Sequence, residues 1–404
     1  MLNVAILGFG VVGSGVYEVI NMNKEKLSDR IGEPISVKKI LDLRTFPGTP
    51  YESIVTSDMN EILSDPEISV VVECMGGSHP AYDYSMASLK AGKSVVTSNK
   101  EVVANFGSEL LAEARKNGVK YLFEASVGGG IPLIHPLCEC LSINNVEQIA
   151  GILNGTTNYI LTRMLNEGLP FDEVLAEAQR LGYAEKNPTA DVDGIDAARK
   201  ICILSDIAYG KEVSVSEIRA EGIRNITSRD VEDAHKIGCK IKLLGYSRPD
   251  GDGIYCLVAP FFVPVENIIS QADDVFNCVL VTGNAVGDVA FYGRGAGKLP
   301  TAAAIVSDIT EAVLSSSCKL LWTKNNNKDY VRDPETLPGR LYVRFASDNA
   351  SFITDTVSCE ASVISEKDGK VSVVTGITTE KELKKSLCIL EEKGIKAESL
   401  IRLL

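Results

Sequence analysis

The chain has 404 residues, of which 45% are hydrophobic and 24% are charged, and its formal net charge is −13. This length allows two or three domains with large cores, and the composition is that of an ordinary globular protein. The negative charge argues against nucleic acid or an anionic membrane surface as the main partner. No stretch reaches the roughly 20 apolar residues of a membrane span, so we expect no membrane partner.

The ten cysteines lie mostly inside apolar segments, and the chain has three histidines. Because no Cys-x-x-Cys pair occurs and histidines are few, a zinc site is not expected. The N-terminus starts with a strand-like run and not with a signal-type segment. Together these features favour a cytoplasmic protein with reduced thiols.

The first residues predict a dinucleotide-binding loop. Leu2–Leu7 is an apolar run that predicts a strand, GFGVVG follows it, and a helical pattern comes next. In this context a Gly-x-Gly-x-x-Gly motif lets the backbone approach a pyrophosphate at a helix N-terminus. The alternative is a tight turn without a ligand. The candidate cofactor contacts are Gly8, Phe9, Gly10, Val11, Val12 and Gly13.

The predicted second strand, Ile35–Leu41, ends at Asp42, and Arg44 lies two residues further on. An acidic residue here favours the ribose hydroxyls of NAD, whereas an arginine can hold the 2′-phosphate of NADP. Both are present, so NAD and NADP remain alternatives. A solvated loop charge without a ligand role is a third interpretation of either residue.

Further strands are predicted over residues 67–74, 94–98 and 119–125, with helices over 80–90 and 101–118. This alternation predicts a Rossmann-type, doubly wound parallel sheet of the α/β class. Lys100 precedes the second helix, where a cation opposes the helix dipole. We therefore expect Lys100 to face a carboxylate or phosphate at the carboxyl end of the sheet.

Residues 126–132, SVGGGIP, follow Glu124 and are too rich in glycine for the interior of a helix or strand. A carboxylate together with backbone carbonyls is suited to a hard monovalent cation. A hinge between two domains explains the same residues equally well.

After this loop the alternation changes. A strand is predicted over residues 146–153, the polar run 154–158 opens a helix, and another helix follows over 171–181. That polar run serves either as a helix cap or as a grip on a small polar ligand. Apolar runs between 210 and 290 predict an antiparallel sheet, and the glycine-rich loop 293–300 leads into a late helix.

Residues 182–200, GYAEKNPTADVDGIDAARK, contain the most chemically suggestive stretch. One interpretation is a capped helix, with Asp193 as N-cap, Asp196 at the third helical position and an ordinary surface pair between Asp196 and Lys200. The other is that this carboxylate and ammonium, four residues apart on one helix face, move a proton next to a charged substrate.

A polar linker is expected over residues 325–337, and residues 339–404 read as strand, helix, strand, strand, helix, strand. This βαββαβ order predicts a small ferredoxin-like domain. Such units bind effectors or mediate dimerisation.

Seven motifs, in this order, resemble homoserine dehydrogenases. They are GFGVVG, VVECMGG, VVTSNKE, FEASVGGGIP, GILNGTTNYIL, GYAEKNPTADVDGIDAARK and YGRGAGKLPTAAAIVSDI, and the match covers nearly all of residues 1–320. The C-terminal part is similar to an ACT domain, a regulatory module often found in this family.

The resemblance implies NAD(P)-dependent interconversion of L-aspartate 4-semialdehyde and L-homoserine, a small-molecule reaction on the branch towards threonine and methionine. It implies an NAD(P)-binding domain over residues 1–135, completed by a returning helix over 300–320. An α+β domain for catalysis, substrate binding and dimerisation is expected over 136–299, followed by a linker over 325–338 and an ACT-like domain over 339–404. A homodimer or homotetramer is expected.

The resemblance also implies roles for individual residues. Lys200 resembles the catalytic lysine beside Asp196, and Lys100 the lysine between cofactor and substrate. The remaining matches are the substrate acids Glu185 and Asp191, the substrate neighbours Gly155, Thr156 and Tyr183, the cofactor contacts Arg44, Gly76 and Gly297, and the loop for a sodium-type cation formed by Glu124, Val127, Gly129 and Ile131.

Two positions depart from the family pattern. Arg294 stands where proline is common, and residues 348–350, Asp-Asn-Ala, stand where ACT domains usually have an Asp-x-x-Gly-type ligand loop. Two other functions are compatible with the same residues. One is a dehydrogenase of a different small amino or hydroxy acid, and the other is a non-catalytic nicotinamide sensor.

Overall fold

The computed structural model describes residues 1–314, 321–357 and 359–404. These residues form two compact units. The first unit contains residues 1–145, 202–215 and 293–326, and the second contains 146–201, 216–292 and 327–404. Each unit has its own sheet.

The sheet of the first unit is parallel, with the strand order β3-β2-β1-β4-β5-β6. The strands are β1 (Leu2–Leu7), β2 (Ile35–Leu41), β3 (Val55–Thr56), β4 (Ile68–Glu73), β5 (Ser94–Thr97) and β6 (Tyr121–Leu122). The order reverses between β1 and β4, which is where sheets of this type bind ligands. The predicted doubly wound parallel sheet is confirmed.

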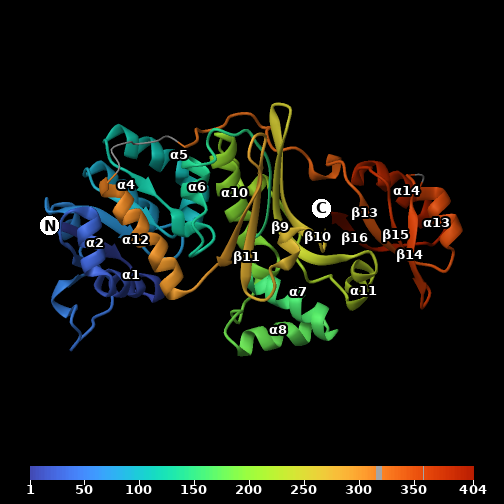
Figure 1. Cartoon of the computed structure of the whole chain (residues 1–404), viewed down its shortest axis with the longest axis horizontal. Coiled ribbons are helices and arrows are strands. Elements are labelled where there is room, and N and C mark those ends of the chain that lie inside the picture. Colours follow the sequence, from blue (N-terminus) through green and yellow to red (C-terminus); the bar gives the residue numbers. More distant parts are fainter. Residues whose placement is uncertain (315–320, 358) are drawn as a thin grey trace. The chain divides into compact units, whose positions relative to one another are not determined.

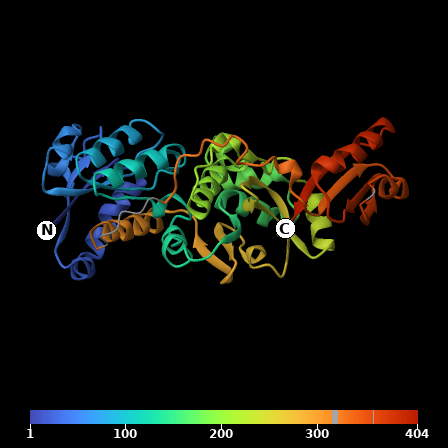
Figure 2. The same ribbon diagram turned by 90° about the horizontal axis from the view of Figure 1, so that it is seen from above.

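Helices cover both faces of this sheet. They are α1 (Val11–Met22), α2 (Lys24–Ile31), α3 (Asn60–Leu63), α4 (Ala81–Lys90), α5 (Lys100–Lys116), α6 (Ile134–Glu139) and α12 (Lys298–Leu314). Figures 1 and 2 show α4 and α5 on the face opposite to α1 and α12. Because both faces are covered, every residue of β1 is buried.

The single tryptophan of the chain, Trp322, is buried in the first unit. Its ring lies against α5 at Gly107, where a Cβ atom would come within 2.4 Å of the ring. The ring of Phe123 packs on it with centroids 5.6 Å apart. A side chain at position 107 would therefore displace the tryptophan.

The expected strand over residues 119–125 is mostly wrong. Only Tyr121–Leu122 is extended, and a 3-10 turn follows over Glu124–Ser126. The buried carboxylate of Glu124 accepts hydrogen bonds from the backbone N–H groups of Leu133, Ile134 and His135, at 2.6, 2.9 and 2.6 Å. These bonds draw Glu124 to the start of α6, out of line with the sheet.

The second unit is built on a mixed sheet with the order β12-β11-β7-β9-β10-β16-β13-β15-β14 and with β8 paired to β10. Its strands before the tail are β7 (Val146–Ile152), β8 (Arg219–Ala220), β9 (Cys239–Asp250), β10 (Gly253–Pro264), β11 (Phe276–Gly283) and β12 (Gly287–Arg294). The pairs β7 with β9, β9 with β10 and β7 with β11 are antiparallel. The pairing of β9 with β10 is the antiparallel arrangement predicted for residues 210–290, whereas the place of β7 in this sheet was not predicted.

The helices that begin in this part are α7 (Gly155–Glu167), α8 (Phe171–Arg180), α9 (Thr189–Val192), α10 (Ile195–Tyr209) and α11 (Ser228–Lys236). The apolar runs between 210 and 290 predict strands only, so α11 is not anticipated from them. It is a polar helix that begins with a capping box, in which Thr227 and Asp230 bond reciprocally.

Residues 341–403, called the tail below, have the predicted βαββαβ order. The elements are β13 (Leu341–Ala346), α13 (Ala350–Val357), β14 (Ser362–Lys367), β15 (Lys370–Val374), α14 (Glu380–Glu392) and β16 (Ala397–Leu403). The strand order β16-β13-β15-β14 is that of a ferredoxin-like fold. Alternate residues of β13 and β15 form one apolar core with α13 and α14.

The tail continues the sheet of the second unit, because β16 pairs in parallel with β10. Phe262 of β10 and Tyr342 of β13 pack ring against ring, with centroids 4.7 Å apart. The sequence does not predict this pairing, which joins strands about 140 residues apart in the chain.

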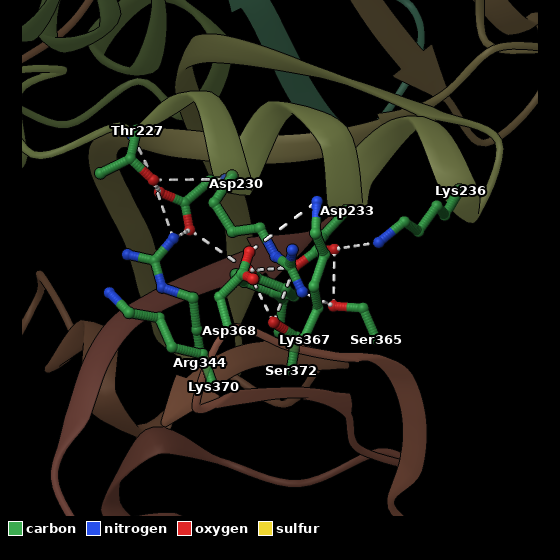
Figure 3. Close-up of polar contacts among 12 residues, drawn as sticks. Thr227, Asp230, Asp233, Lys236, Arg344, Ser365, Lys367, Asp368, Lys370 and Ser372 are labelled. Carbon is green, nitrogen blue, oxygen red and sulfur yellow. Dashed lines mark hydrogen bonds and ion pairs between the residues drawn. The ribbon is translucent and has the colours of Figure 1, made fainter. Parts of the chain in front are cut away.

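The face of the tail sheet away from α13 and α14 is polar and lies on α11 (Figure 3). Asp233 of α11 accepts hydrogen bonds from Ser372, Ser365 and Tyr342 at 2.6, 2.7 and 3.0 Å. Arg344 forms an ion pair with Asp230 at 2.8 Å. Both aspartate side chains are fully buried. We call these contacts the α11 network.

Candidate active site

The loop after β1 has the geometry of a dinucleotide-binding turn. Gly8 has a φ of +84°, which favours glycine, and a Cβ atom on Gly13 would lie 2.1 Å from the carbonyl oxygen of Gly8. Gly10 is the N-cap of α1, and a Cβ there would meet open space. The first turn of α1, which the structure describes in full, has no acidic side chain to compete with a phosphate.

Asp42 binds both the loop and its neighbouring arginine. Its carboxylate accepts the Phe9 N–H at 2.8 Å and the Nε and Nη2 of Arg44 at 2.9 and 2.8 Å. The Arg44 guanidinium holds the pKa of Asp42 well below its usual range. Arg44 is 61% exposed. The Asp42 carboxylate therefore binds both the Phe9 N–H and the guanidinium of Arg44, and the guanidinium faces solvent.

Lys100 begins α5 at the carboxyl end of β5, as expected, with Asn99 as N-cap. The Asn99 amide also donates to the carbonyl of Gly77 at 2.8 Å, beside Gly76. Glu73, fully buried at the end of β4, accepts from the Thr97 hydroxyl at 2.5 Å, and burial raises its pKa. Sequence reasoning missed Glu73 and Asn99, which shape the loop that carries Gly76.

The glycine-rich loops 126–132 and 293–300 of the first unit are in contact. A Cβ on Gly129 would lie 2.5 Å from the carbonyl oxygen of Gly295, and the Gly130 N–H donates to the Arg294 carbonyl at 3.3 Å. Gly297 has a φ of +128° and leads into α12. Gly15 of α1 approaches the side chain of Lys298 so closely that a Cβ would come within 3.0 Å. The structure thus brings the late loop to the helix of the dinucleotide motif.

Glu124, the side chain proposed for the cation loop, is buried between α6 and α12. Besides its bonds to the start of α6, its N–H donates to Asp308 of α12 at 2.8 Å. Burial raises the pKa of Asp308 well above its usual range. Val127 and Ile131 are buried as well, and Gly129 has a φ of +57°. The carboxylate and backbone oxygens of this loop are of the type that a hard cation takes.

The ammonium group of Lys200 is held at the start of α10. Its Nζ donates to the carboxylate of Asp196 at 2.8 Å and to the carbonyl of Leu153 at 2.6 Å. Lys200 is 8% exposed and Asp196 5%. The spacing of four residues on one helix produces the ion pair, but this is a buried pair and not a surface pair.

Asn154 joins this pair to a second acid. Its amide nitrogen donates to Asp191 at 2.7 Å and to Asp196 at 3.0 Å, while its carbonyl oxygen caps α7 by accepting the N–H of Thr157. Asn154 is absent from the predicted site residues. Its place directly after β7, in a polar run that opens a helix, is the signal that favours it.

The remaining predicted substrate neighbours lie around the start of α7 and the end of α8. The Thr156 hydroxyl donates to the carbonyl of Tyr183 at 2.6 Å, and the Tyr183 ring packs on Tyr159. A Cβ on Gly155 would lie 2.8 Å from the carbonyl of Val275. Glu185 is exposed, and its backbone carbonyl accepts from Gln179.

The expectation that Asp193 caps α10 is wrong. The helix starts at Ile195, and Gly194, with a φ of +80°, accepts its first backbone bond from Ala198. The Asp193 carboxylate instead binds Arg224, with an Nε–Oδ1 distance of 2.5 Å. Asp193 therefore fixes a neighbouring segment and leaves the helix start to glycine.

Within the described residues, no three or more histidine, cysteine, aspartate or glutamate side chains form a metal-binding cluster. None of the nine described cysteines forms a disulfide. No described helix combines the length and hydropathy needed to cross a membrane. The second unit offers a buried lysine bonded to the Asp196 carboxylate, with the Asp191 carboxylate joined to Asp196 through Asn154. This arrangement is suited to proton transfer and to binding a cationic group.

Comparisons with known proteins agree with a dinucleotide-binding unit and a catalytic unit. Residues 132–310 match the family model described as homoserine dehydrogenase, and residues 8–124 match the one described as homoserine dehydrogenase, NAD binding domain. A homoserine dehydrogenase of Lactococcus lactis subsp. lactis is 38% identical over 398 residues, covering 93% of this chain and 92% of the relative.

Among solved structures, a homoserine dehydrogenase from Thiobacillus denitrificans matches with a TM-score of 0.87 at 36% identity, over 100% of this chain and 98% of that chain. A hyperthermophilic archaeal homoserine dehydrogenase mutant in complex with NADPH matches with a TM-score of 0.66 at 28% identity. That match covers 78% of this chain and 98% of the archaeal chain.

Proposed function

Because the chain belongs to the homoserine dehydrogenase family of NAD(P)-dependent oxidoreductases, we propose that Lys200 is the proton donor when L-aspartate 4-semialdehyde is reduced to L-homoserine. The observation that carries this role is the buried ammonium group held by Asp196 and by the Leu153 carbonyl. A bound nicotinamide would supply the hydride. The aldehyde oxygen then develops negative charge, and Lys200 neutralises it by giving a proton, directly or through one water.

The substrate is a small zwitterion, so its ammonium group needs carboxylates. Asp191 would serve here, because Asn154 joins it to Asp196 and thereby to Lys200. Glu185 is the second acid for this role, and Gly155, Thr156 and Tyr183 would border the substrate. In the reverse direction the same lysine accepts the proton of the hydroxyl group.

The cofactor is a nicotinamide dinucleotide, NADP or NAD. Its pyrophosphate would lie on the loop Gly8–Gly13, with Gly76, Lys100 and Gly297 as further contacts and Arg44 towards the ribose. The positive φ of Gly8 and the open space at Gly10 support this assignment. A monovalent cation, with sodium as the candidate, would be structural and held by Glu124 and the carbonyls of Val127, Gly129 and Ile131.

We also propose that the tail is an ACT-like module and that the enzyme is a homodimer or homotetramer. A cavity of about 990 Å³ in the second unit, lined by Tyr246, Phe261 and Leu280 of the sheet and by Leu337 and Leu404, offers a surface for a second copy. A cytoplasmic location agrees with the finding that none of the described cysteines forms a disulfide. The proposed reaction belongs to the biosynthetic branch towards threonine and methionine.

The test of the activity is a steady-state assay with L-aspartate 4-semialdehyde and NADPH or NADH, with and without threonine. Other small aldehydes and keto acids serve as comparison substrates. Preference for one of them would indicate a dehydrogenase of a different small acid. Cofactor binding without hydride transfer to any of them would indicate a nicotinamide sensor.

The test of Lys200 is the substitution Lys200→Ala. We expect kcat to fall about 100- to 10,000-fold, because the proton donor is lost. Cofactor affinity, measured by titration of NADPH fluorescence, should stay within twofold. Turnover near the wild-type value would remove Lys200 from the mechanism.

A further inference from the structure

Two segments lie end to end along one edge of β10. The short strand β8 pairs in parallel with residues 257–258 of β10, and the tail strand β16 pairs in parallel with residues 261–262. A strand rises about 3.3 Å per residue, so the end of β8 and the paired part of β16 are neighbours. Glu221, which directly follows β8, thereby comes next to Arg402 of β16.

Glu221 and Arg402 form a two-pronged ion pair. The Nη1 and Nη2 atoms of Arg402 donate to the two carboxylate oxygens of Glu221 at 3.0 and 2.9 Å. Arg402 is 4% exposed and also binds the buried carboxylate of Glu380. Arg219 reaches the same Glu221 carboxylate at 2.9 Å. Such paired hydrogen bonds fix direction as well as distance.

The three residues after Glu221 lie against the turn between α9 and α10. A Cβ on Gly222 would come within 2.2 Å of the Val192 carbonyl oxygen, so the two backbones are in direct contact. The Ile223 N–H donates to that carbonyl at 2.9 Å. The Arg224 guanidinium binds the Asp193 carboxylate.

That turn connects the two acids of the candidate active site. Asp191 lies in α9 before the turn, and Asp196 lies in α10 after it. The amide of Asn154 donates to both. A displacement of residues 192–194 would therefore change the spacing of Asp191 and Asp196, and with it the bond from Asp196 to Lys200.

We propose that Arg402 and Glu221 are positioning residues for the reaction. Through residues 222–224, this pair holds the turn 192–194, so that Asp191 keeps the position in which it would bind the substrate ammonium. The tail thereby acts on substrate binding without contributing a side chain that touches the substrate. This inference rests on the proposed substrate role of Asp191.

The tail is attached to the rest of the second unit by the Glu221–Arg402 pair and also by the α11 network. Variants in the α11 network therefore serve as the control for variants in the pair. Tyr342 and Ser372 bind Asp233 in the middle of α11, and these hydrogen bonds involve neither residues 222–224 nor residues 192–194. Variants there weaken the attachment of the tail but leave the connection through Glu221 in place.

The experiment compares Glu221→Ala, Glu221→Gln and Arg402→Lys with Tyr342→Phe and Ser372→Ala in the full-length protein. For each variant, kcat, the KM for L-aspartate 4-semialdehyde, the KM for NADPH and the thermal midpoint are measured. We expect Glu221→Ala and Arg402→Lys to raise the KM for the aldehyde about three- to thirtyfold, with a smaller change in kcat. Glu221→Gln keeps the side-chain length and one acceptor oxygen, so its KM for the aldehyde should lie between those of the wild type and Glu221→Ala.

The KM for NADPH should not change in any of the five variants. Tyr342→Phe and Ser372→Ala should lower the thermal midpoint but leave the KM for the aldehyde within twofold. Equal changes in KM in both groups, or none in the Glu221 and Arg402 variants of an active enzyme, would overturn the proposal. A wild-type protein that does not reduce the aldehyde would refute the proposed function instead.

Discussion

Asn154 combines two tasks in the candidate site. Its carbonyl oxygen caps α7, while its amide nitrogen holds Asp191 and Asp196 together. Two neighbouring carboxylates repel each other, and a shared donor offsets this repulsion. Position 154 therefore requires a short side chain that combines an acceptor oxygen with a nitrogen carrying two donor hydrogens, which is the amide of asparagine.

Replacing Asn154 by serine separates the two tasks, because serine also caps helices but has no amide to donate. We expect kcat/KM for L-aspartate 4-semialdehyde to fall about ten- to hundredfold while the thermal midpoint changes little. The control is Asn267→Ser, at a cap in the same unit where Asn267 accepts the Ile269 N–H. An unchanged kcat/KM in Asn154→Ser would contradict the role of the amide.

Arg44 lies where it can influence the choice between NADP and NAD. Removing it in Arg44→Ala frees the Asp42 carboxylate for ribose hydroxyls and removes a cation that a 2′-phosphate would meet. We expect the ratio of the KM for NADPH to the KM for NADH to rise about fivefold, as for one exposed charge-assisted contact. Arg30→Ala, an exposed cation on α2, is the control. An equal rise for both cofactors would show that Arg44 does not select between them.

The α11 network shows how an element that the sequence analysis did not predict organises the tail. Burial acts to raise the pKa of Asp233, but hydrogen bonds from Ser372, Lys236, Ser365 and Tyr342 outweigh it, so the pKa is lowered. A carboxylate with a lowered pKa stabilises the fold above its unfolded value of about 3.9, and this stabilisation is lost as the pH falls through the folded value.

We therefore expect the thermal midpoint of the wild-type protein to fall more steeply below about pH 4 than that of Asp233→Asn. At pH 7 the variant should lose about 1.5–3 kcal/mol, because several bonds to a charged group are weakened. Glu232→Gln, on the exposed side of the same helix, is the control. Parallel pH profiles for wild type and Asp233→Asn would contradict the prediction.

Elements with a strong local pattern could be predicted from the sequence. β1 and β2 have the predicted bounds, because each is a short run rich in apolar residues that ends at a turn. The tail has the predicted order, because alternate residues of β13 and β15 are apolar and buried. What failed depends on distant partners. Glu124 ends its strand because it binds α6, Asp193 is drawn to Arg224, and β16 joins β10 far along the chain.

In the candidate site, too, contacts between neighbours on one helix could be predicted, but contacts with distant residues could not. The pair Asp196 and Lys200 follows from helical spacing, so its contact could be predicted. Its burial could not, because this depends on the Leu153 carbonyl at the end of β7. The bridge through Asn154 also joins residues that are 37 and 42 positions apart.

The tail covers the edge of β10 in the sheet of the second unit. A chain ending at residue 326 would expose the edge of β10 around Phe262 and leave Asp230 and Asp233 without the partners that the tail supplies. Open edges pair with other chains. We expect this truncated protein to show a lower thermal midpoint and to aggregate in size-exclusion chromatography, whereas the full chain elutes as one species. A monodisperse truncated protein with an unchanged midpoint would contradict this expectation.

The position of Trp322 gives the first unit an optical reporter of its own. The chain has one tryptophan and 13 tyrosines, so selective indole excitation samples only the surroundings of α5 and Phe123. A buried indole emits at shorter wavelength than a hydrated one, and its emission therefore follows the loss of this packing. Comparing that signal with far-ultraviolet circular dichroism, which averages over all helices and strands, would tell whether the dinucleotide-binding unit melts alone or together with the remainder of the chain.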